Sequence, residues 1–74
     1  MKEFITNFAN QWDDTEAEVF TPDCAFHDLE EWSSLVGLAI LNMIVKKYGV
    51  KVAPEELKAA VTIEDVYNLV QSKL

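Results

Sequence analysis

Apolar residues recur at helical spacing in three parts of the chain, and the first part is Lys2–Trp12. Their one-three-four spacing is that of an amphipathic helix with one buried face. Acids near a helix C-terminus oppose the helix dipole, so the pair Asp13-Asp14 predicts that this helix ends there. The residues expected to be buried are Phe4, Ile5, Phe8 and Trp12.

The second helical pattern, Ser34–Tyr48, is apolar on nearly all sides. Such a helix either lies at the centre of a bundle or presents an apolar face to a partner or ligand. Ser33 is the natural N-cap, because its hydroxyl can accept a hydrogen bond from an unpaired backbone N–H group. Lys46 and Lys47 suit the negative end of the helix dipole, and Gly49 can supply the left-handed residue that ends the helix.

The third pattern lies near the end of the chain, where Thr62 is the predicted cap of a helix and Asp65 completes a variant of the capping box. Ahead of it, Pro54 opens a brief helical turn over Glu55–Ala60. The apolar stripe of the last helix consists of Ile63, Val66, Leu69 and Val70. The prediction is an all-α fold in which residues 1–74 form one domain, a small four-helix bundle of three main helices and one short helix.

The connection over Asp14–Ser33 is the least regular part of the chain. Thr21-Pro22-Asp23 predicts a turn, or a short helical turn that Thr21 caps. A connection of this length in a compact domain is usually functional or contains a short helix. The side chains expected to pin it to the core are Val19, Phe20, Phe26, Leu29 and Trp32, and we interpret Trp32 as a core anchor.

Length and charge restrict the function. A chain of 74 residues buries only about 60% of the surface that it exposes when unfolded, so a deep substrate pocket is hard to build. The net charge of −7 argues against nucleic-acid binding, which needs a basic face. Nine acids precede Ser34 against one lysine, which indicates either a solvated acidic surface or a surface that steers a basic partner toward Ser34.

Targeting signals are not evident in the sequence. No apolar run of the length of a signal peptide follows Lys2. The most apolar stretch, Leu35–Val45, is too short to span a bilayer. We therefore expect a cytoplasmic protein without membrane insertion, and we expect it to be a monomer.

The inventory of reactive side chains argues against an enzyme. Cys24 is the only cysteine and has no basic neighbour, so we interpret it as a small apolar residue. His27 is the only histidine, and we expect it to be a solvated loop residue. A Ser34–His27 nucleophilic pair would also need an orienting group and an oxyanion hole. Zinc-ligand clusters, a glycine-rich phosphate loop and an EF-hand are all absent from the sequence.

Ser34 suits a different role. Backbone N–H groups at a helix N-terminus are unpaired, and the positive end of the dipole favours an attached phosphate. A serine at this position is therefore well placed to carry a phosphodiester. The alternative is that Ser33 and Ser34 are both simply cap residues.

The ordered set of residues around Ser34 resembles the acyl carrier protein family, over essentially the whole chain from Phe4 to Val70. Phe26 lies eight residues before Ser34, Leu29 stands between them, and Leu35 follows the serine. The segments that continue the family pattern at similar distances are Tyr48-Gly49-Val50-Lys51-Val52, Pro54 and Thr62-Ile63-Glu64-Asp65.

The resemblance implies a four-helix bundle in which a phosphopantetheinyl transferase esterifies Ser34 with 4′-phosphopantetheine. The thiol of that arm would carry an acyl or aminoacyl thioester between loading and acyl-transferring enzymes, so the protein would be a shuttle and not a catalyst. Two features depart from the family. Ser33 stands where the family has aspartate, and the second helix has no acids, which lie instead at Asp28, Glu30 and Glu31. We infer a dedicated carrier with its own partners, outside primary fatty-acid synthesis.

The site predicted from the resemblance centres on Ser34, with Ser33 as the helix cap beside it and Leu35 next in the chain. The residues expected to line the surface where partners dock are Glu30, Glu31, Val36, Gly37, Leu38 and Ile40. The residues expected around a cargo chain between the helices are Phe26, Leu41, Ile44, Ile63 and Val66. The alternative hypothesis is an unmodified helical interaction module with a carrier-like fold, which the Ser33 departure favours.

Overall fold

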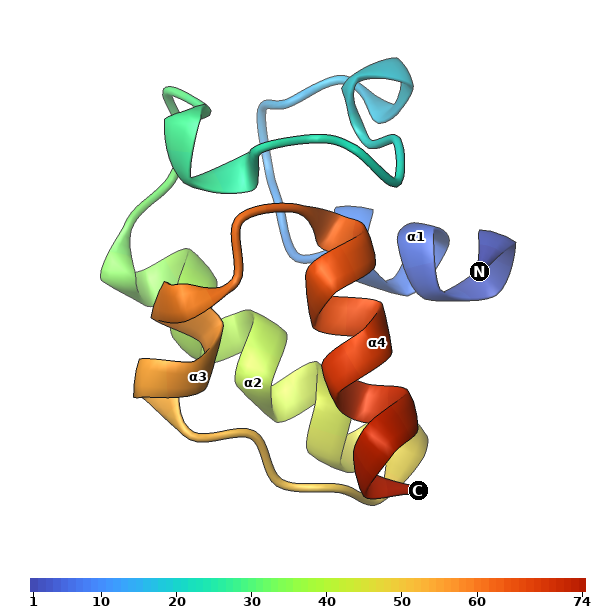
Figure 1. Cartoon of the computed structure of the whole chain (residues 1–74). Coiled ribbons are helices and arrows are strands. Elements are labelled where there is room, and N and C mark those ends of the chain that lie inside the picture. Colours follow the sequence, from blue (N-terminus) through green and yellow to red (C-terminus); the bar gives the residue numbers. More distant parts are fainter.

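Four α-helices and two short 3₁₀ turns make up the regular structure of residues 1–74 in the computed structural model (Figure 1). The helices are α1 (Lys2–Ala9), α2 (Ser34–Tyr48), α3 (Pro54–Ala59) and α4 (Ile63–Lys73). The 3₁₀ turns are η1 (Ala17–Val19) and η2 (Phe26–Asp28). The predicted all-α class, with three main helices and one short helix, is confirmed.

Local capping sets the bounds of α2 and α4 where the sequence predicts them. Ser33 Oγ accepts a hydrogen bond from the backbone N–H of Val36 at 3.4 Å, and Gly49 ends α2 in the left-handed region at φ 69°. At α4, Thr62 Oγ1 accepts from the Asp65 N–H and Asp65 Oδ2 accepts from the Thr62 N–H, both at 3.1 Å. Each cap pairs backbone groups that the helix itself leaves free.

The first helix ends earlier than predicted. The α-helix stops at Ala9, and Gln11 and Trp12 continue it with tighter bonds to the carbonyls of Phe8 and Ala9. This turn ends directly before the acidic pair and brings the Trp12 ring to 5.4 Å from the ring of Phe20.

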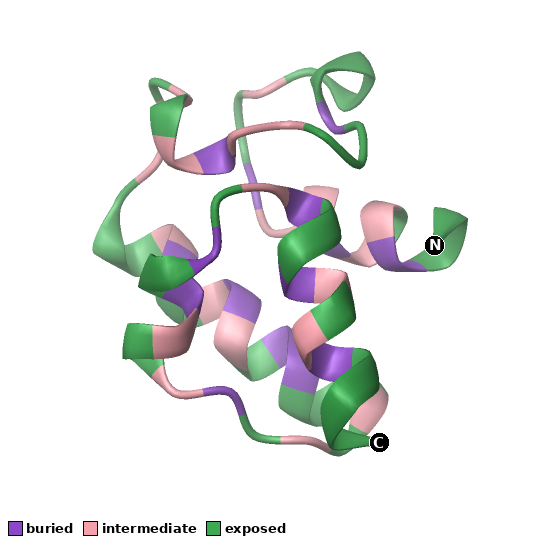
Figure 2. Cartoon of the chain, in the orientation of Figure 1, coloured by how far each residue is buried: buried purple, intermediate pink, exposed green.

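The core is shared among all four helices and the connection between α1 and α2 (Figure 2). Its fully buried centre is made by Phe4, Phe8, Phe26, Ile40, Ile44, Ile63, Val66 and Val70. Phe4, Phe8 and Trp12 are buried as predicted, whereas Ile5 is only half-buried. The aromatic rings meet mainly in tilted and T-shaped pairs, such as Phe8 with Phe26 at 5.2 Å.

The long connection is held against the N-terminus of α4. The predicted turn is present, because the Cys24 N–H donates to the carbonyl of Thr21 at 3.0 Å. Beside it, the Ile63 and Glu64 N–H groups donate to the carbonyls of Cys24 and Pro22 at 3.2 and 2.9 Å. The helical turn considered at Pro22 does not form.

The side chains expected to pin this connection differ in burial. Phe20 and Phe26 are buried, and Leu29 and Trp32 are half-buried against the core. The prediction for Val19 is wrong, because its side chain is 39% exposed at the end of η1.

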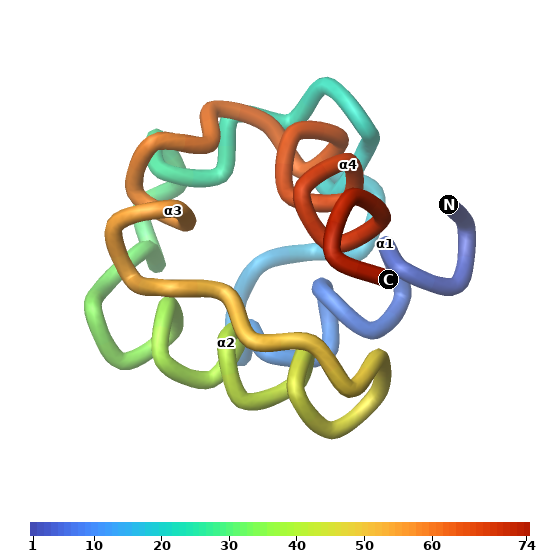
Figure 3. Tube along the Cα trace, turned by 60° about the horizontal axis from the view of Figure 1, so that its bottom comes forward, coloured from blue at the N-terminus to red at the C-terminus, as the bar shows by residue number.

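The helices surround the core, with α2 in contact with both α1 and α3. Figures 1 and 3 place α1 and α3 on different sides of the bundle, with α4 completing the enclosure. None of the helices is long and apolar enough to cross a membrane. The contact between α2 and α3 leaves one surface groove, and this groove adjoins Ser34.

Candidate functional site

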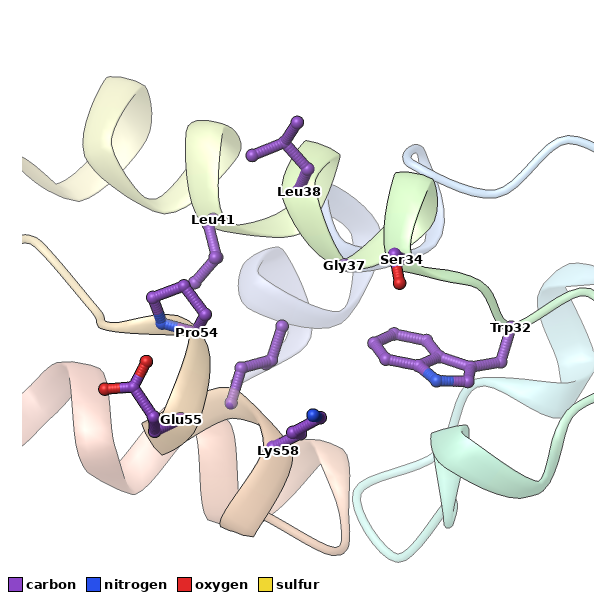
Figure 4. A pocket seen from close by; sticks show the side chains of 9 residues that line it. Trp32, Ser34, Gly37, Leu38, Leu41, Pro54, Glu55 and Lys58 are labelled. Atoms are coloured by element: carbon purple, nitrogen blue, oxygen red, sulfur yellow. The ribbon is translucent and has the colours of Figure 1, made fainter.

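An open groove of about 370 Å³ runs between α2 and α3 (Figure 4), and we refer to it as the α2–α3 groove. Ser34, Gly37, Leu38 and Leu41 line it on the α2 side. Pro54, Glu55, Leu57 and Lys58 line it on the α3 side, and Trp32 stands at the end near Ser34. The volume lies in the lower part of the range of small-molecule sites.

Ser34 and Ser33 play different parts although they are neighbours. The Ser33 hydroxyl is engaged as the cap of α2. Ser34 is the first residue of α2, it is exposed, and its hydroxyl makes no hydrogen bond within the chain. The backbone N–H groups of Ser34 and Leu35 have no acceptor within the chain either, so the positive end of α2 surrounds a free hydroxyl.

Trp32 closes the end of the groove and fills the space beside Gly37. A Cβ atom at position 37 would lie 3.0 Å from Cη2 of Trp32, a distance that real Cβ contacts rarely show. On its other sides the indole meets Trp12 at 6.1 Å and Phe26 at 5.5 Å between ring centroids. Trp32 therefore anchors to the core as predicted while part of its ring borders the groove.

His27 packs against Trp32, and the prediction of a solvated loop histidine is wrong. Its ring meets the Trp32 indole edge-on at 4.5 Å, and its Nε2 lies 3.1 Å from the carbonyl oxygen of Leu57. That carbonyl lies at the end of the short helix α3, where the Val61 N–H donates to Asp65 instead of to Leu57. The imidazole thus pairs a carbonyl that α3 leaves free and joins η2 to α3.

The predicted docking residues on α2 separate into two faces. Leu35 and Leu38 are 79% and 56% exposed, and Val36 is half-buried. Gly37 is buried beneath Trp32 yet borders the groove. The prediction for Ile40 is wrong, because this side chain is 0% exposed: it lies three residues after Gly37, on the helix face that packs into the core.

Glu30 and Glu31 also differ. Glu30 is exposed. The Glu31 carboxylate accepts from the Thr15 hydroxyl at 2.7 Å and from the backbone N–H groups of Asp13 and Asp14. The bond from Thr15, together with the backbone donors, holds the pKa of Glu31 below its usual range. Glu31, three residues ahead of Ser34, therefore ties the end of the connection to its start at residues 13–15, and we refer to these hydrogen bonds as the clasp of Glu31. The sequence did not reveal this role, because the donors are sixteen to eighteen residues away from Glu31.

The residues predicted around a cargo chain do not share one space. Leu41 lines the α2–α3 groove. The other four lie closed in the core at 0% exposure: Phe26, Ile44, Ile63 and Val66. Of the residues predicted around a cargo chain, only Leu41 thus borders a space open at the surface, which is the α2–α3 groove and not the centre of the bundle.

The remaining reactive groups form no second centre. Cys24 is half-buried, and burial raises the pKa of its thiol. No cluster of His, Cys, Asp or Glu side chains has the arrangement of a metal site. The Ser34 hydroxyl and the His27 imidazole make no hydrogen bond to one another, and His27 Nε2 instead lies 3.1 Å from the carbonyl oxygen of Leu57.

Comparison of the chain with profiles of known protein families, with curated proteins and with solved structures finds no match. The fold and the site therefore define the class. It is a small all-helical protein whose central helix begins with a free, exposed serine beside a partly apolar groove.

Proposed function

We propose that the chain is a carrier protein that holds acyl or aminoacyl groups as thioesters on a 4′-phosphopantetheine arm attached to Ser34. The observation that carries the proposal is that the two neighbouring serines differ in their hydrogen bonding. Ser33 caps α2, and this leaves the Ser34 hydroxyl unpaired and exposed at the groove. A serine that served only as a cap would use its hydroxyl within the helix.

The surroundings of Ser34 fit a phosphodiester. The free N–H groups of Ser34 and Leu35 and the dipole of α2 favour a negative charge at this point. Lys58 brings a positive charge to the opposite wall of the groove (Figure 4). No carboxylate caps the start of α2, so no negative side chain competes for these donors.

The modification itself is a transfer from coenzyme A. The Ser34 hydroxyl gives up its proton, its Oγ forms the new bond to phosphorus, and the bond from that phosphorus to the 3′,5′-ADP leaving group breaks. The transferase supplies the base and the metal for this step, so the chain itself is not an enzyme. When attached, the arm supplies a thiol that can form and exchange thioesters.

Partner enzymes would meet the chain around Ser34. Leu35 and Leu38 offer an exposed apolar contact one turn apart on α2, and Glu30 is an exposed acid four residues before Ser34 in the chain. Charged residues at the rim of such a contact set orientation and association rate more than affinity. We infer that loading and acyl-transferring enzymes dock on this surface with the arm between them and the chain.

Intact-mass measurement tests the proposal. Incubation with coenzyme A and a broad-specificity phosphopantetheinyl transferase is expected to add the mass of one phosphopantetheine to the wild type and none to Ser34→Ala. The matched control is Ser72→Ala, because Ser72 is an exposed helical serine far along the chain in α4. No gain on the wild type, or an equal gain on Ser34→Ala, contradicts the proposal.

A second function, an unmodified interaction module, is favoured by one observation. Leu35 and Leu38 are large, apolar and exposed on the same face of α2, as in helices that bind a partner helix. In cells that lack their own copy of the gene, this function predicts that Ser34→Ala restores the wild-type phenotype and Leu38→Asp does not. Val61→Asp, at a residue 60% exposed outside the helices, is the control.

A further inference from the structure

The Ser34 end of the groove is aromatic, and the rest of its apolar lining is aliphatic. Trp32 is the only aromatic side chain among the lining residues. Its six-membered ring is the part that reaches Gly37, since both Cη2 and Cζ2 lie within 3.6 Å of a Cβ placed there. Figure 4 shows the Ser34 hydroxyl at the same end of the groove as the indole. The attachment point and the indole therefore share one end of the groove.

Trp32 is also held in place, so it offers a preformed surface. Its indole is packed by Phe26 at 5.5 Å, by His27 at 4.5 Å and by Trp12 at 6.1 Å between ring centroids. His27 is in turn tied to the carbonyl of Leu57, a residue that lines the groove. A ring fixed on several sides loses little conformational entropy when a ligand packs against it.

The charges of the groove favour an uncharged occupant. Glu55 and Lys58 contribute one negative and one positive charge on the α3 side. Leu38, Leu41 and Leu57 supply the apolar lining, which favours an uncharged group, and the two opposite charges leave the α3 side without a net charge. A flat aromatic ring gains more binding free energy here than its buried area alone would give, because aromatic pairs form favourable offset and edge-to-face contacts.

We propose that Trp32 is a specificity-determining residue that favours cargo with a flat, uncharged aromatic ring over saturated cargo of the same size. The proposal rests on the proposed function, because the ring would reach the groove on an arm attached to Ser34. The contact between Trp32 and Gly37 makes this selection possible, since any larger residue at position 37 would displace the indole.

Free thioesters test the selection without any modification of the protein. The probes are S-benzoyl-pantetheine and S-cyclohexanecarbonyl-pantetheine, which have the same number of ring carbons and differ in planarity. They are titrated into the Ser34→Ala chain, and binding is followed by the NMR signals of the Trp32 indole N–H and the Gly37 amide. The benzoyl probe is expected to bind about three- to tenfold more tightly, with shifts at these two groups.

Two variants assign the preference to the indole. Trp32→Leu is expected to make the two probes bind equally, and Trp32→Phe to keep a reduced preference for the benzoyl probe. Tyr67→Leu is the control, because Tyr67 is a half-buried aromatic residue that packs on Phe4 and does not line the groove. Circular dichroism confirms that each variant is folded, and the comparison of the two probes on the Ser34→Ala chain stands even where a variant unfolds.

The outcomes separate the two proposals. The role of Trp32 is overturned if both probes bind equally or if neither binds. It is also overturned if the shifts are confined to residues outside the groove, or if the preference survives Trp32→Leu. Modification of Ser34 in the mass experiment together with equal probe binding leaves the carrier function standing and removes the selection. Preferential benzoyl binding without modification of Ser34 contradicts the carrier function and leaves the groove as a site for free aryl compounds.

Discussion

The indole of Trp32 occupies the space that a side chain at Gly37 would need, with Cη2 3.0 Å from the position of the missing Cβ. The two residues come from different elements, since Trp32 precedes α2 and Gly37 lies in its first turns. Their contact brings an aromatic ring against the helix that Ser34 begins. It therefore links the end of the connection, the start of α2 and the end of the groove in one packed unit.

Substitution of Gly37 by alanine tests this contact. In a helix, alanine is favoured over glycine by about 0.8–1.0 kcal/mol. We expect that gain to be cancelled in Gly37→Ala, because the new methyl group displaces a tryptophan packed by three other rings. Urea unfolding of Gly37→Ala, Trp32→Leu and the double variant measures this. The alanine should raise the free energy of unfolding only in the Trp32→Leu background, so the coupling free energy between positions 32 and 37 should be at least about 0.5 kcal/mol. Additive free energies of unfolding would contradict the contact.

Gly49 is needed for its backbone and not for space. Its φ is 69°, and no atom outside Gly49 and its two chain neighbours lies within 4 Å of a Cβ placed there. Gly49→Ala is expected to lower the free energy of unfolding by about 1–2 kcal/mol, because the left-handed conformation strains a residue that has a Cβ. Gly49→Asn should lose less, since asparagine tolerates this region. Equal losses in the two variants would argue against strain as the cause.

Acid should weaken the clasp made by Glu31. Because its pKa is lowered in the folded chain, the folded state binds fewer protons than the unfolded state at this group. The stabilisation is present above the ordinary value of 4.5 and is lost as pH falls below it. Melting temperatures of the wild type should therefore fall over this range, and those of Glu31→Gln should fall less steeply.

Glu30→Gln is the control for this pH dependence. Glu30 is the exposed neighbour of Glu31, and its carboxylate makes no hydrogen bond within the chain. Its substitution removes a carboxylate of the same charge without removing a hydrogen bond, so a difference between the two variants reports the hydrogen bonds of Glu31. An unaltered slope in Glu31→Gln would assign the acid sensitivity to the other carboxyl groups whose pKa values hydrogen bonds also lower, which are Asp23, Glu56 and Asp65.

The two helix caps should differ in strength. Thr62→Ala removes a cap at 3.1 Å that Asp65 reciprocates, and we expect it to cost about 1 kcal/mol of the free energy of unfolding. Ser33→Ala removes a longer bond of 3.4 Å without a reciprocal partner, so its cost should be smaller. Ser33→Asp should restore the cap of α2. Chemical denaturation gives the order of these variants, and a larger loss in Ser33→Ala would contradict the geometry.

Features that depend on neighbours in the sequence could be predicted. The start of α2 after Ser33, its end at Gly49 and the capping box of Thr62 and Asp65 each involve residues within a few positions of one another. The exposure of Ser34 at the first position of α2 follows from the same local rules. Ile40 could not be placed in this way, because α2 is apolar on nearly all sides and the pattern alone does not say which side faces the core.

Hydrophobic periodicity and capping chemistry act over one or two turns, so the residues alone determine an all-helical chain whose second helix begins at Ser34. The tertiary structure alone determines which residues line the α2–α3 groove, which groups hydrogen-bond to Glu31, and that His27 packs against Trp32. These depend on contacts such as His27 with Leu57, thirty residues apart, and Glu31 with Thr15, sixteen apart. Contacts at that separation form only when the whole core packs, which is why the surroundings of Ser34 are a property of the fold.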